Sequence, residues 1–288
     1  MGILNVTPDS FSDGGSYSTV DAAVAAARQM VEDGADIIDI GGESTRPDAA
    51  SVDPDREQQR IVPVILELAA RGVLISVDTR NASTMAAALR AGAAIVNDVS
   101  GLKYDPEAMA VVAENGCPVV LMHMRGTPAT MRGLGAYDDV VEDVVAELRA
   151  CAEKAERAGV RRAAIMLDPG IGFAKDANQS VALLRGLNRL LSLGYPLLVG
   201  VSRKSFIGTV ANEPDPRKRL PGSLVAALFA LTHGAAILRV HDVAETRQAI
   251  QVWSALNSGA IDHATGRRGL DLRAEAAGGR LIGETPGP

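Results

Sequence analysis

The sequence predicts an α/β protein of the (β/α)8 TIM barrel class, folded as a single domain. Eight short apolar segments alternate with eight longer segments of helical period, and seven of the helical segments are followed by glycine. The apolar segments are continuous, as expected where helices cover one face of a parallel sheet and packed side chains fill the other. An open doubly wound sheet usually carries a glycine-rich phosphate fingerprint after its first strand, and none follows Leu4.

The predicted elements follow in a regular order along the chain. Strands are predicted at residues 2–5, 35–41, 74–78, 94–97, 118–123, 163–168, 196–200 and 236–240. Helices are predicted near residues 18–33, 55–71, 82–91, 106–115, 137–158, 178–193, 221–233 and 244–257. The glycines that follow helices, and that can adopt a left-handed helix-ending conformation, are Gly34, Gly72, Gly92, Gly116, Gly159, Gly194 and Gly234. We therefore expect a barrel over residues 1–257 and a flexible extension over 258–288.

Composition and charge argue against several classes of protein. The net charge of −6 and a pI near 5.3 give no basic field for a nucleic-acid backbone. The longest apolar stretch, residues 223–240, contains His233 and Arg239 and is too polar for a membrane span. We expect no signal peptide, and Cys117 and Cys151 lack metal-ligand spacing. The sequence thus predicts a cytoplasmic protein with reduced thiols and with neither a nucleic-acid nor a membrane partner.

Polar or charged side chains close the predicted strands at their carboxyl ends. They are Asn5, Asp39, Asp78, Asn97 with Asp98, His123, Asp168, Lys204 just beyond the seventh strand, and Arg239 with His241. A single residue of this kind is more often a helix cap or a turn residue than a catalyst. Stability does not require eight of them at one end of a barrel, because buried unpaired carboxylates are costly, and active sites of this fold lie at that end. The ring therefore predicts an enzyme.

The ring of strand ends contains two kinds of chemistry. Carboxylates and amides can recognise a polar heterocycle through its N–H and amino groups, whereas Lys204, Arg239 and His241 suit a phosphate or pyrophosphate. The four histidines show no zinc-ligand spacing. Magnesium fits better, because it needs few protein ligands beside phosphate oxygens. The ring thus indicates a ligand with a heterocyclic end and a phosphorylated end.

Two long connections and one turn add candidate site residues. Residues 7–18 and 43–54 follow the first two strands and are either binding loops or ordinary surface excursions. Lys204 stands in the segment Ser202-Arg203-Lys204-Ser205, where it either contacts substrate or caps a helix. We favour substrate contact, because Gly200 permits a close backbone approach.

Longer motifs surround all eight strand ends. They are Gly2-Ile-Leu-Asn-Val-Thr-Pro-Asp-Ser-Phe-Ser-Asp-Gly-Gly15, Asp39-Ile-Gly-Gly-Glu-Ser-Thr-Arg-Pro47, Ser76-Val-Asp-Thr79, Asn97-Asp-Val-Ser100, Leu121-Met-His-Met124, Leu167-Asp-Pro-Gly-Ile-Gly-Phe173, Ser202-Arg-Lys-Ser205 and Arg239-Val-His-Asp242. Together they resemble the dihydropteroate synthase family, from Gly2 to about Leu256. The resemblance implies a transferase of folate biosynthesis. Such an enzyme joins 6-hydroxymethyl-7,8-dihydropterin pyrophosphate to p-aminobenzoate and releases 7,8-dihydropteroate and pyrophosphate.

The resemblance also implies a role for each matching residue. The pterin would be bound by Asp78, Asn97, Met122, Asp168, Phe173 and Lys204, of which Asp78, Asp168 and Lys204 would be catalytic. Asn5 would ligate Mg2+ and would hold the pyrophosphate together with Arg239 and His241. The p-aminobenzoate site would be formed by Phe11, Ser12, Asp13, Thr45, Arg46, Pro47 and Ser205.

The implied mechanism is an SN1-like substitution. Mg2+ and cationic groups would stabilise the departing pyrophosphate, while Asp78 and Asp168 would stabilise the pterin cation that the amine attacks. By the same resemblance we expect a cytoplasmic homodimer packed through barrel helices. Family members are inhibited by sulfonamides, which mimic p-aminobenzoate, and the loops leave both sensitivity and insensitivity open.

Two other functions stay open from the sequence. A pterin-binding barrel that passes a methyl group from methyltetrahydrofolate to a corrinoid shares the acids and amides, but it would not need the segments Ser202–Ser205 and Thr45–Pro47. A noncatalytic relative could bind a pterin as a regulator or scaffold, although the whole ring and both loops are retained. Family members also carry a lead-in segment before the first strand, so the true start lies either at Met1 or upstream.

Overall fold

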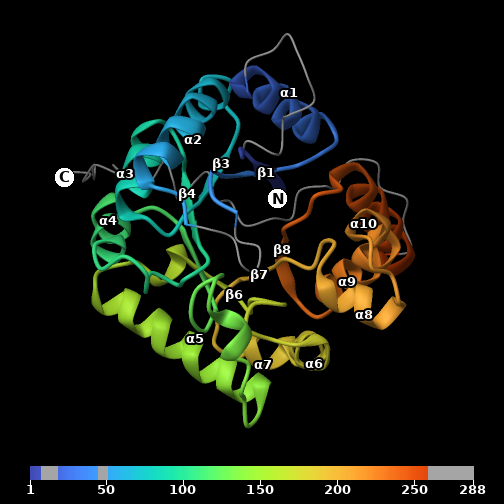
Figure 1. Ribbon diagram of the computed structural model, residues 1–288. Coiled ribbons are helices and arrows are strands. Elements are labelled where there is room, and N and C mark those ends of the chain that lie inside the picture. The colour runs from blue at the N-terminus through green and yellow to red at the C-terminus, as the bar shows by residue number, and fades with distance from the viewer. Residues whose placement is uncertain (8–18, 45–50, 259–288) are drawn as a thin grey trace, which may run out of the picture.

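An eight-stranded parallel sheet forms the centre of the fold, in a computed structural model that describes residues 1–7, 19–44 and 51–258. The strands are β1 (Gly2–Asn5), β2 (Ile38–Gly41), β3 (Ile75–Asp78), β4 (Ile95–Asp98), β5 (Val119–Met122), β6 (Ile165–Asp168), β7 (Leu197–Val199) and β8 (Ala235–Leu238). They pair in chain order, and an isolated parallel bridge joins Gly2 to Val240 beyond β8. Because this bridge links the last strand to the first, the sheet curls round on itself, an α/β arrangement consistent with a TIM barrel (Figure 1).

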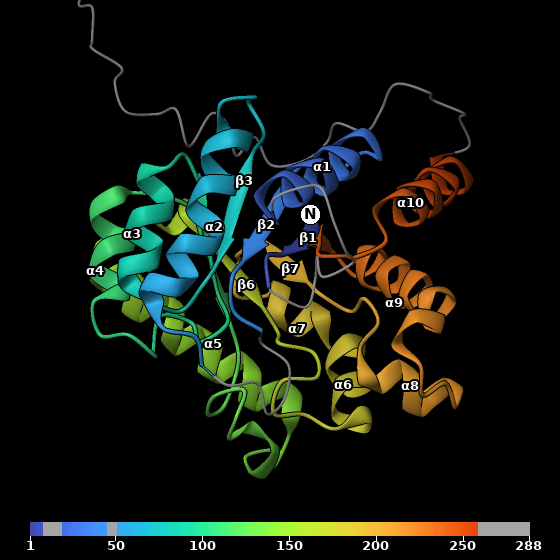
Figure 2. The ribbon, with the colours of Figure 1, turned by 45° about the horizontal axis from the view of Figure 1, so that its top comes forward.

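In the described part of the chain, helices follow every strand and lie on the outer side of the sheet (Figure 1 and Figure 2). They are α1 (Thr19–Glu32), α2 (Pro54–Ala69), α3 (Ala82–Arg90), α4 (Ala108–Asn115), α5 (Val140–Arg157), α6 (Ala177–Arg185), α7 (Leu187–Leu191), α8 (Ser205–Ala211), α9 (Leu220–Thr232) and α10 (Val243–Ser258). Asp53, Asp139 and Asp176 begin α2, α5 and α6, because their carboxylates accept backbone N–H groups of the first helical turn. At α6, Gln179 completes a capping box with Asp176.

Strand alternation divides the side chains of the sheet into an outer and an inner set. The outer set, which includes Ile38, Ile40 and Leu121, packs against the helices in the main core. The inner set forms a separate apolar group, here called the inner cluster, of Ile37, Ile95, Val120, Met166 and Leu198. Side chains point to the same face at every second residue, so the next inward positions are Asp39, Asn97, Met122, Asp168 and Gly200. The barrel interior is therefore apolar at one end and mainly polar at the carboxyl ends of the strands.

All the predicted strands and all but one of the predicted helices are present, with ends moved by a few residues. The seven glycines predicted to follow helices all have positive φ, from 61° to 110°. The single helix predicted at 178–193 was wrong, because the chain divides at Gly186 into α6 and α7. A Cβ at Gly186 would lie 2.7 Å from Cγ1 of Val141 in α5, so close packing of neighbouring helices accounts for glycine at the break. Helix α8 was not among the predicted helices, although the alternative that Lys204 caps a helix implied one; Lys204 does precede α8, but its side chain forms no capping hydrogen bond.

The sequence predicts reduced thiols and no membrane-spanning segment. Cys117 and Cys151 are free and buried, as predicted. Within residues 1–7, 19–44 and 51–258, no helix combines the length and the apolar character that a membrane crossing requires.

Candidate active site

Arg239 joins two acidic strand ends inside the barrel. Its Nε donates to Asp39 Oδ2 at 2.6 Å, and its Nη2 donates to Asp78 Oδ2 at 2.7 Å. Asn97 Nδ2 donates to the same oxygen of Asp39 at 3.0 Å. Side chains at the carboxyl ends of β2, β3, β4 and β8 are thus linked, as the pattern of polar strand ends predicts. We call Asp39, Asp78, Asn97 and Arg239 the arginine cluster.

Burial and neighbouring charges shift the pKa values of Asp78 and Arg239. The side chain of Asp39 is fully buried, and only 6% of Asp78 is exposed. Burial raises the pKa of Asp78 to about 7, although Arg239 opposes this rise, and the nearby Asp39 adds to it. Burial alone would lower the pKa of Arg239, but Asp39 and Asp78 hold it above its usual range. A permanent cation therefore lies between two buried carboxyl groups, of which Asp78 can bind a proton near neutral pH.

A second group of site residues surrounds Lys204, at the start of α8. Its Nζ donates to the carbonyl oxygen of Ile171 and lies 4.7 Å from the centre of the Phe173 ring. Asp168 Oδ1 accepts the backbone N–H of Gly170 at 2.7 Å. Burial lowers the pKa of Lys204 to about 8 against the effect of Asp168, and burial raises the pKa of Asp168 against the effect of Lys204. Lys204 is therefore a cation that can release its proton not far above neutral pH.

Apolar side chains border this second group. Met122 and Phe173 belong to one small cluster, in which Met122 is buried and Phe173 is half-buried. Val99, Met124, Met131 and Ala174 complete the packing around them. The resulting surface places an aromatic ring and a thioether beside the carboxylate and the lysine, which suits a flat, polar ring system.

The close approach expected at Gly200 is not a strict requirement in the structure. A Cβ at this position would lie 3.8 Å from Arg239 Cβ and 3.9 Å from Lys204 Nζ, which are ordinary van der Waals distances. The long Lys204 side chain reaches the site from the turn that precedes α8. The structure thus brings Lys204 to Phe173 and the turn after β6 without a close approach at Gly200, and its contact with substrate stays a prediction.

His241 is oriented by the turn after β7. Its Nδ1 lies 3.0 Å from Ser202 Oγ, and its backbone N–H donates to the same hydroxyl at 3.2 Å. Because Ser202 accepts that N–H, its own proton can be donated to Nδ1, which places the proton of a neutral His241 on Nε2. Arg203 supports the same turn, since its Nε donates to Asp242 Oδ2 at 3.1 Å. The ends of β7 and β8 are thus held together by side chains.

Two strand-end residues point away from the barrel interior. His123 follows the inward Met122, and its Nε2 lies 3.0 Å from Glu147 Oε2 of α5. Asp98 follows the inward Asn97 and accepts backbone N–H groups in the following turn. The expectation that His123 and Asp98 belong to the ring was wrong, because adjacent strand residues face opposite sides.

The remaining predicted site residues are either partly or fully exposed, or they are not among the residues that the structure describes. Asn5 ends β1 and is half-buried, and Ser205 is the exposed first residue of α8. The residues Phe11, Ser12, Asp13, Thr45, Arg46 and Pro47 lie outside the residues that the structure describes.

Sequence reasoning missed two features of the site. Asp39 was placed in the ring of polar strand ends, but its hydrogen bonds from Arg239 and Asn97 were not foreseen. Glu43 and Arg80 form a buried two-bond pair, with Nε and Nη2 donating to the two carboxylate oxygens at 3.0 and 2.9 Å. The spacing of Asp39 two residues after Ile37 could have indicated its inward direction. No local signal indicates the pairing of Glu43 with Arg80, because they come from different strand ends.

Among the described residues, Asn5 is compatible with magnesium held together with a phosphorylated ligand. Among the described residues, no three histidine, cysteine, aspartate or glutamate side chains gather as a metal-binding group. Asn5 offers one neutral amide oxygen, and Mg2+ is commonly held by one or two protein oxygens together with phosphate oxygens and water. Asn5 fits that pattern.

Comparisons with known proteins extend over most of the chain. The pterin binding enzyme family matches residues 1–241. A dihydropteroate synthase from Synechocystis is 48% identical over 257 residues, which are 89% of this chain and 89% of the relative. The chain belongs to the dihydropteroate synthase family. It is accordingly an enzyme, a transferase of folate synthesis.

Solved dihydropteroate synthases share its fold. The Xanthomonas albilineans enzyme with 4-aminobenzoic acid is 47% identical, with a TM-score of 0.85 over 89% of this chain and 92% of that one. The Yersinia pestis enzyme in a sulfonamide drug complex is 44% identical, with a TM-score of 0.84 over 89% and 93%. These likenesses favour the synthase over the methyltransferase alternative.

The arginine cluster predicts a pH-dependent loss of stability in one variant. Replacing Arg239 by glutamine leaves Asp39 and Asp78 buried without their cation, so we expect a loss of about 3–5 kcal/mol at pH 8. The loss should be smaller at pH 5. A carboxyl whose folded-state pKa lies above its unfolded value destabilises the fold only as the pH rises toward that folded pKa, and Asp78 is such a group.

Urea unfolding of Arg239→Gln and wild type at both pH values measures this effect. The exposed Arg217→Gln change is the matched control, and it should alter stability by less than about 0.5 kcal/mol. Equal losses for the Arg239 variant at pH 5 and pH 8 would show that its carboxyl partners do not govern the effect.

Proposed function

We propose that this dihydropteroate synthase condenses 6-hydroxymethyl-7,8-dihydropterin pyrophosphate with p-aminobenzoate to give 7,8-dihydropteroate and pyrophosphate. The observation that carries the proposal is the convergence of Asp39, Asp78, Asn97 and Arg239 inside the barrel. Such a cluster supplies hydrogen-bond acceptors and an amide to a heterocycle and a cation to a phosphorylated leaving group. The bound 4-aminobenzoic acid of the Xanthomonas relative supports the choice of amine.

The pterin is assigned to the polar half of the barrel interior. Asp78, Asn97, Asp168 and Lys204 would form hydrogen bonds with its ring nitrogens, amino group and carbonyl oxygen. Met122 and Phe173 would contact the ring face and edge, since they belong to the cluster beside Lys204. The burial of both carboxylates favours this assignment, because a buried acceptor gains most from a ligand N–H donor.

The chemical step is an SN1-like substitution at the exocyclic carbon of the pterin. The bond from this carbon to the pyrophosphate oxygen breaks with its electron pair on the oxygen, and the amine nitrogen of p-aminobenzoate then attacks the carbon and loses a proton. Asp78 and Asp168 would stabilise the positive charge that develops on the pterin. Lys204, whose pKa is lowered to about 8, would donate hydrogen bonds to the ring and restrain it.

The pyrophosphate is assigned to Arg239 and His241. The Nε and Nη2 nitrogens of Arg239 are taken by Asp39 and Asp78, while its Nη1 belongs to neither pair and suits an anion. His241 would donate from Nε2, in the tautomer that Ser202 favours. Asn5 would ligate Mg2+, which when bound supplies positive charge to the leaving group.

The amine substrate is assigned to residues of the two long connections. Phe11, Ser12, Asp13, Thr45, Arg46 and Pro47, together with Ser205, would form the p-aminobenzoate site. Sulfonamides would compete there, as the drug complex of the Yersinia relative suggests. Equal pyrophosphate release with and without a sulfonamide would indicate an insensitive variant.

The proposal also covers the domain organisation, the location and the oligomeric state. Residues 1–257 would form one cytoplasmic (β/α)8 domain, followed by a short extension at 258–288. Helix α9 is apolar on nearly every side, yet Val225 and Phe229 are 70% and 37% exposed. A helix of this composition is normally covered, so we propose that α9 and its neighbours form the interface of a homodimer. Sedimentation as a monomer at micromolar concentration would contradict this assembly.

Release of pyrophosphate tests the proposed function directly. We expect sustained release over many turnovers to require the pterin pyrophosphate, p-aminobenzoate and Mg2+ together, and to stop when the metal is removed with a chelator; a single turnover without p-aminobenzoate is compatible with the SN1-like step. A coupled colorimetric assay with single omissions measures it. Absence of release with all three components would refute the synthase assignment, whereas pterin binding without turnover would favour the noncatalytic alternative.

Asp168→Asn tests the assignment of the pterin. The change removes a charge from a buried site and keeps the size of the side chain, so we expect at least about a tenfold weaker affinity for the pterin pyrophosphate. The exposed Asp138→Asn is the matched control and should bind like wild type. Isothermal titration measures both variants, and unchanged binding by Asp168→Asn would overturn the carboxylate assignment.

A further inference from the structure

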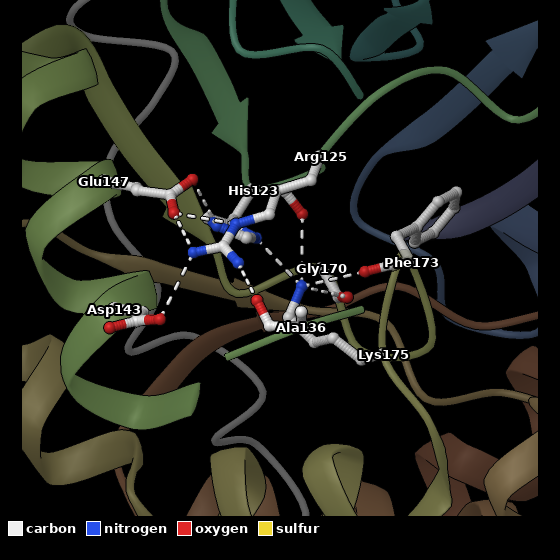
Figure 3. A network of polar contacts seen from close by, with 8 residues as sticks. All are labelled: His123, Arg125, Ala136, Asp143, Glu147, Gly170, Phe173 and Lys175. Atoms are coloured by element: carbon white, nitrogen blue, oxygen red, sulfur yellow. Dashed lines mark hydrogen bonds and ion pairs between the residues drawn. The ribbon is translucent and has the colours of Figure 1, made fainter. Parts of the chain in front are cut away.

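A polar network behind the site contains the second lysine of this region, Lys175. Its Nζ donates to the carbonyl oxygens of Gly170 at 3.1 Å and Phe173 at 2.9 Å, and it lies 2.9 Å from His123 Nδ1 (Figure 3). Lys175 is half-buried, and His123 is 1% exposed. None of the roles proposed above involves this lysine. It lies two residues after Phe173, at the end of the turn that follows β6.

The hydrogen-bond roles in this network are fixed by the chemistry of the ammonium group. In its ammonium form Lys175 has three donors and no acceptor, and it faces four acceptors: His123 Nδ1 and the carbonyl oxygens of Gly170, Phe173 and, at 3.5 Å, His123. His123 Nδ1 must therefore accept, which places the imidazole proton on Nε2, where it donates to Glu147 Oε2 at 3.0 Å. Burial lowers the pKa of His123 to about 3, and Lys175 lowers it further, so the imidazole is neutral.

The network continues from His123 to helix α5. Arg125 Nε donates to the other oxygen of Glu147 at 2.9 Å, and its Nη2 donates to Asp143 at 3.3 Å (Figure 3). The guanidinium of Arg125 also stacks 3.9 Å above the ring centre of Tyr137. The position of Lys175 is therefore set by a chain of contacts that ends on α5.

The turn held by Lys175 carries several contacts of the candidate site. The backbone N–H of Gly170 donates to Asp168, the carbonyl oxygen of Ile171 accepts Lys204, and the ring of Phe173 lies beside Lys204. Gly170 has a φ of +65°, and a Cβ there would lie 2.0 Å from the carbonyl oxygen of His123. The turn is thus pressed against the end of β5, and Lys175 bonds two of its carbonyl oxygens.

We propose that Lys175 is a positioning residue for the pterin side of the active site. By holding the carbonyls of Gly170 and Phe173, it fixes the turn that presents Phe173 and the Ile171 carbonyl to Lys204. The inference extends the proposed function, on which it rests for the identity of the substrate. Loss of the Lys175 ammonium group should therefore disturb the pterin site and leave the p-aminobenzoate site largely intact.

The charge of Lys175 is balanced by groups on several elements. Burial lowers its pKa to about 7; Asp168 and Glu147 oppose this shift, whereas Lys204 and Arg125 add to it. A neutral amine has only two N–H donors, so it satisfies fewer of these four acceptors than the ammonium form does. Deprotonation should therefore loosen the turn, which agrees with a positioning role carried by the ammonium form.

Lys175→Met tests the proposal kinetically. Methionine retains much of the side-chain volume but donates no hydrogen bond, so we expect the KM for the pterin pyrophosphate to rise about tenfold. The KM for p-aminobenzoate should change by less than about twofold. Lys154→Met, an exposed lysine on α5, is the matched control and should behave like wild type. Equal changes in both KM values, or no change in either, would overturn the proposal.

Hydrogen exchange tests the same idea without turnover. The Phe173 amide donates to the carbonyl oxygen of Gly170 at 3.0 Å, the oxygen that also accepts Lys175, so we expect a protected Phe173 amide in ligand-free wild type. Protection should fall at least about tenfold in Lys175→Met. An unprotected amide in wild type would overturn the proposal even if the variant does not fold. Wild type that shows this protection but releases no pyrophosphate would refute the proposed function and leave the structural clamp standing.

Discussion

The placement of one guanidinium between two buried carboxyl groups is the constraint on which the rest of the site depends. Asp39 and Asp78 lie inside the barrel, where an uncompensated negative charge would oppose folding. Arg239 supplies the compensation and, with Asn97, joins the ends of four strands. The same contact therefore contributes to closure of the sheet and to the chemistry assigned to its interior, which explains why the cation cannot be moved without affecting both.

Alternation along the strands makes these two tasks compatible. Ile38 and Ile40 pack outward against helices, while Asp39 between them faces inward. The same division separates Asn97 from Asp98 and Met122 from His123, so that one residue of each pair lines the interior and the next supports the surrounding turns. One such outward residue, His123, joins Glu147 of α5 to Lys175, which bonds backbone carbonyl oxygens of the turn after β6.

Much of this arrangement could be predicted from the sequence, and the exceptions have physical reasons. The strands and the glycines after helices could be found because they depend on local hydrophobic patterns and local conformation. Asp78, Asn97 and Asp168 could be placed at one edge because parallel strands share an orientation. The pairing of Arg239 with Asp39 and Asp78 could not, since it spans 200 and 161 residues and depends on how the sheet curls. The role of Lys175 was missed because it acts on backbone carbonyls.

The inner cluster closes one end of the barrel to substrates and products. Ile37, Ile95, Val120, Met166 and Leu198 fill one end of the barrel with tightly packed apolar side chains. Charged molecules cannot pass through such packing, so both reactants and both products of the proposed reaction must use the single mouth at the opposite end. Substrate binding and product release then take place at the same end of the barrel. Pyrophosphate therefore has to dissociate before the next pterin substrate can bind.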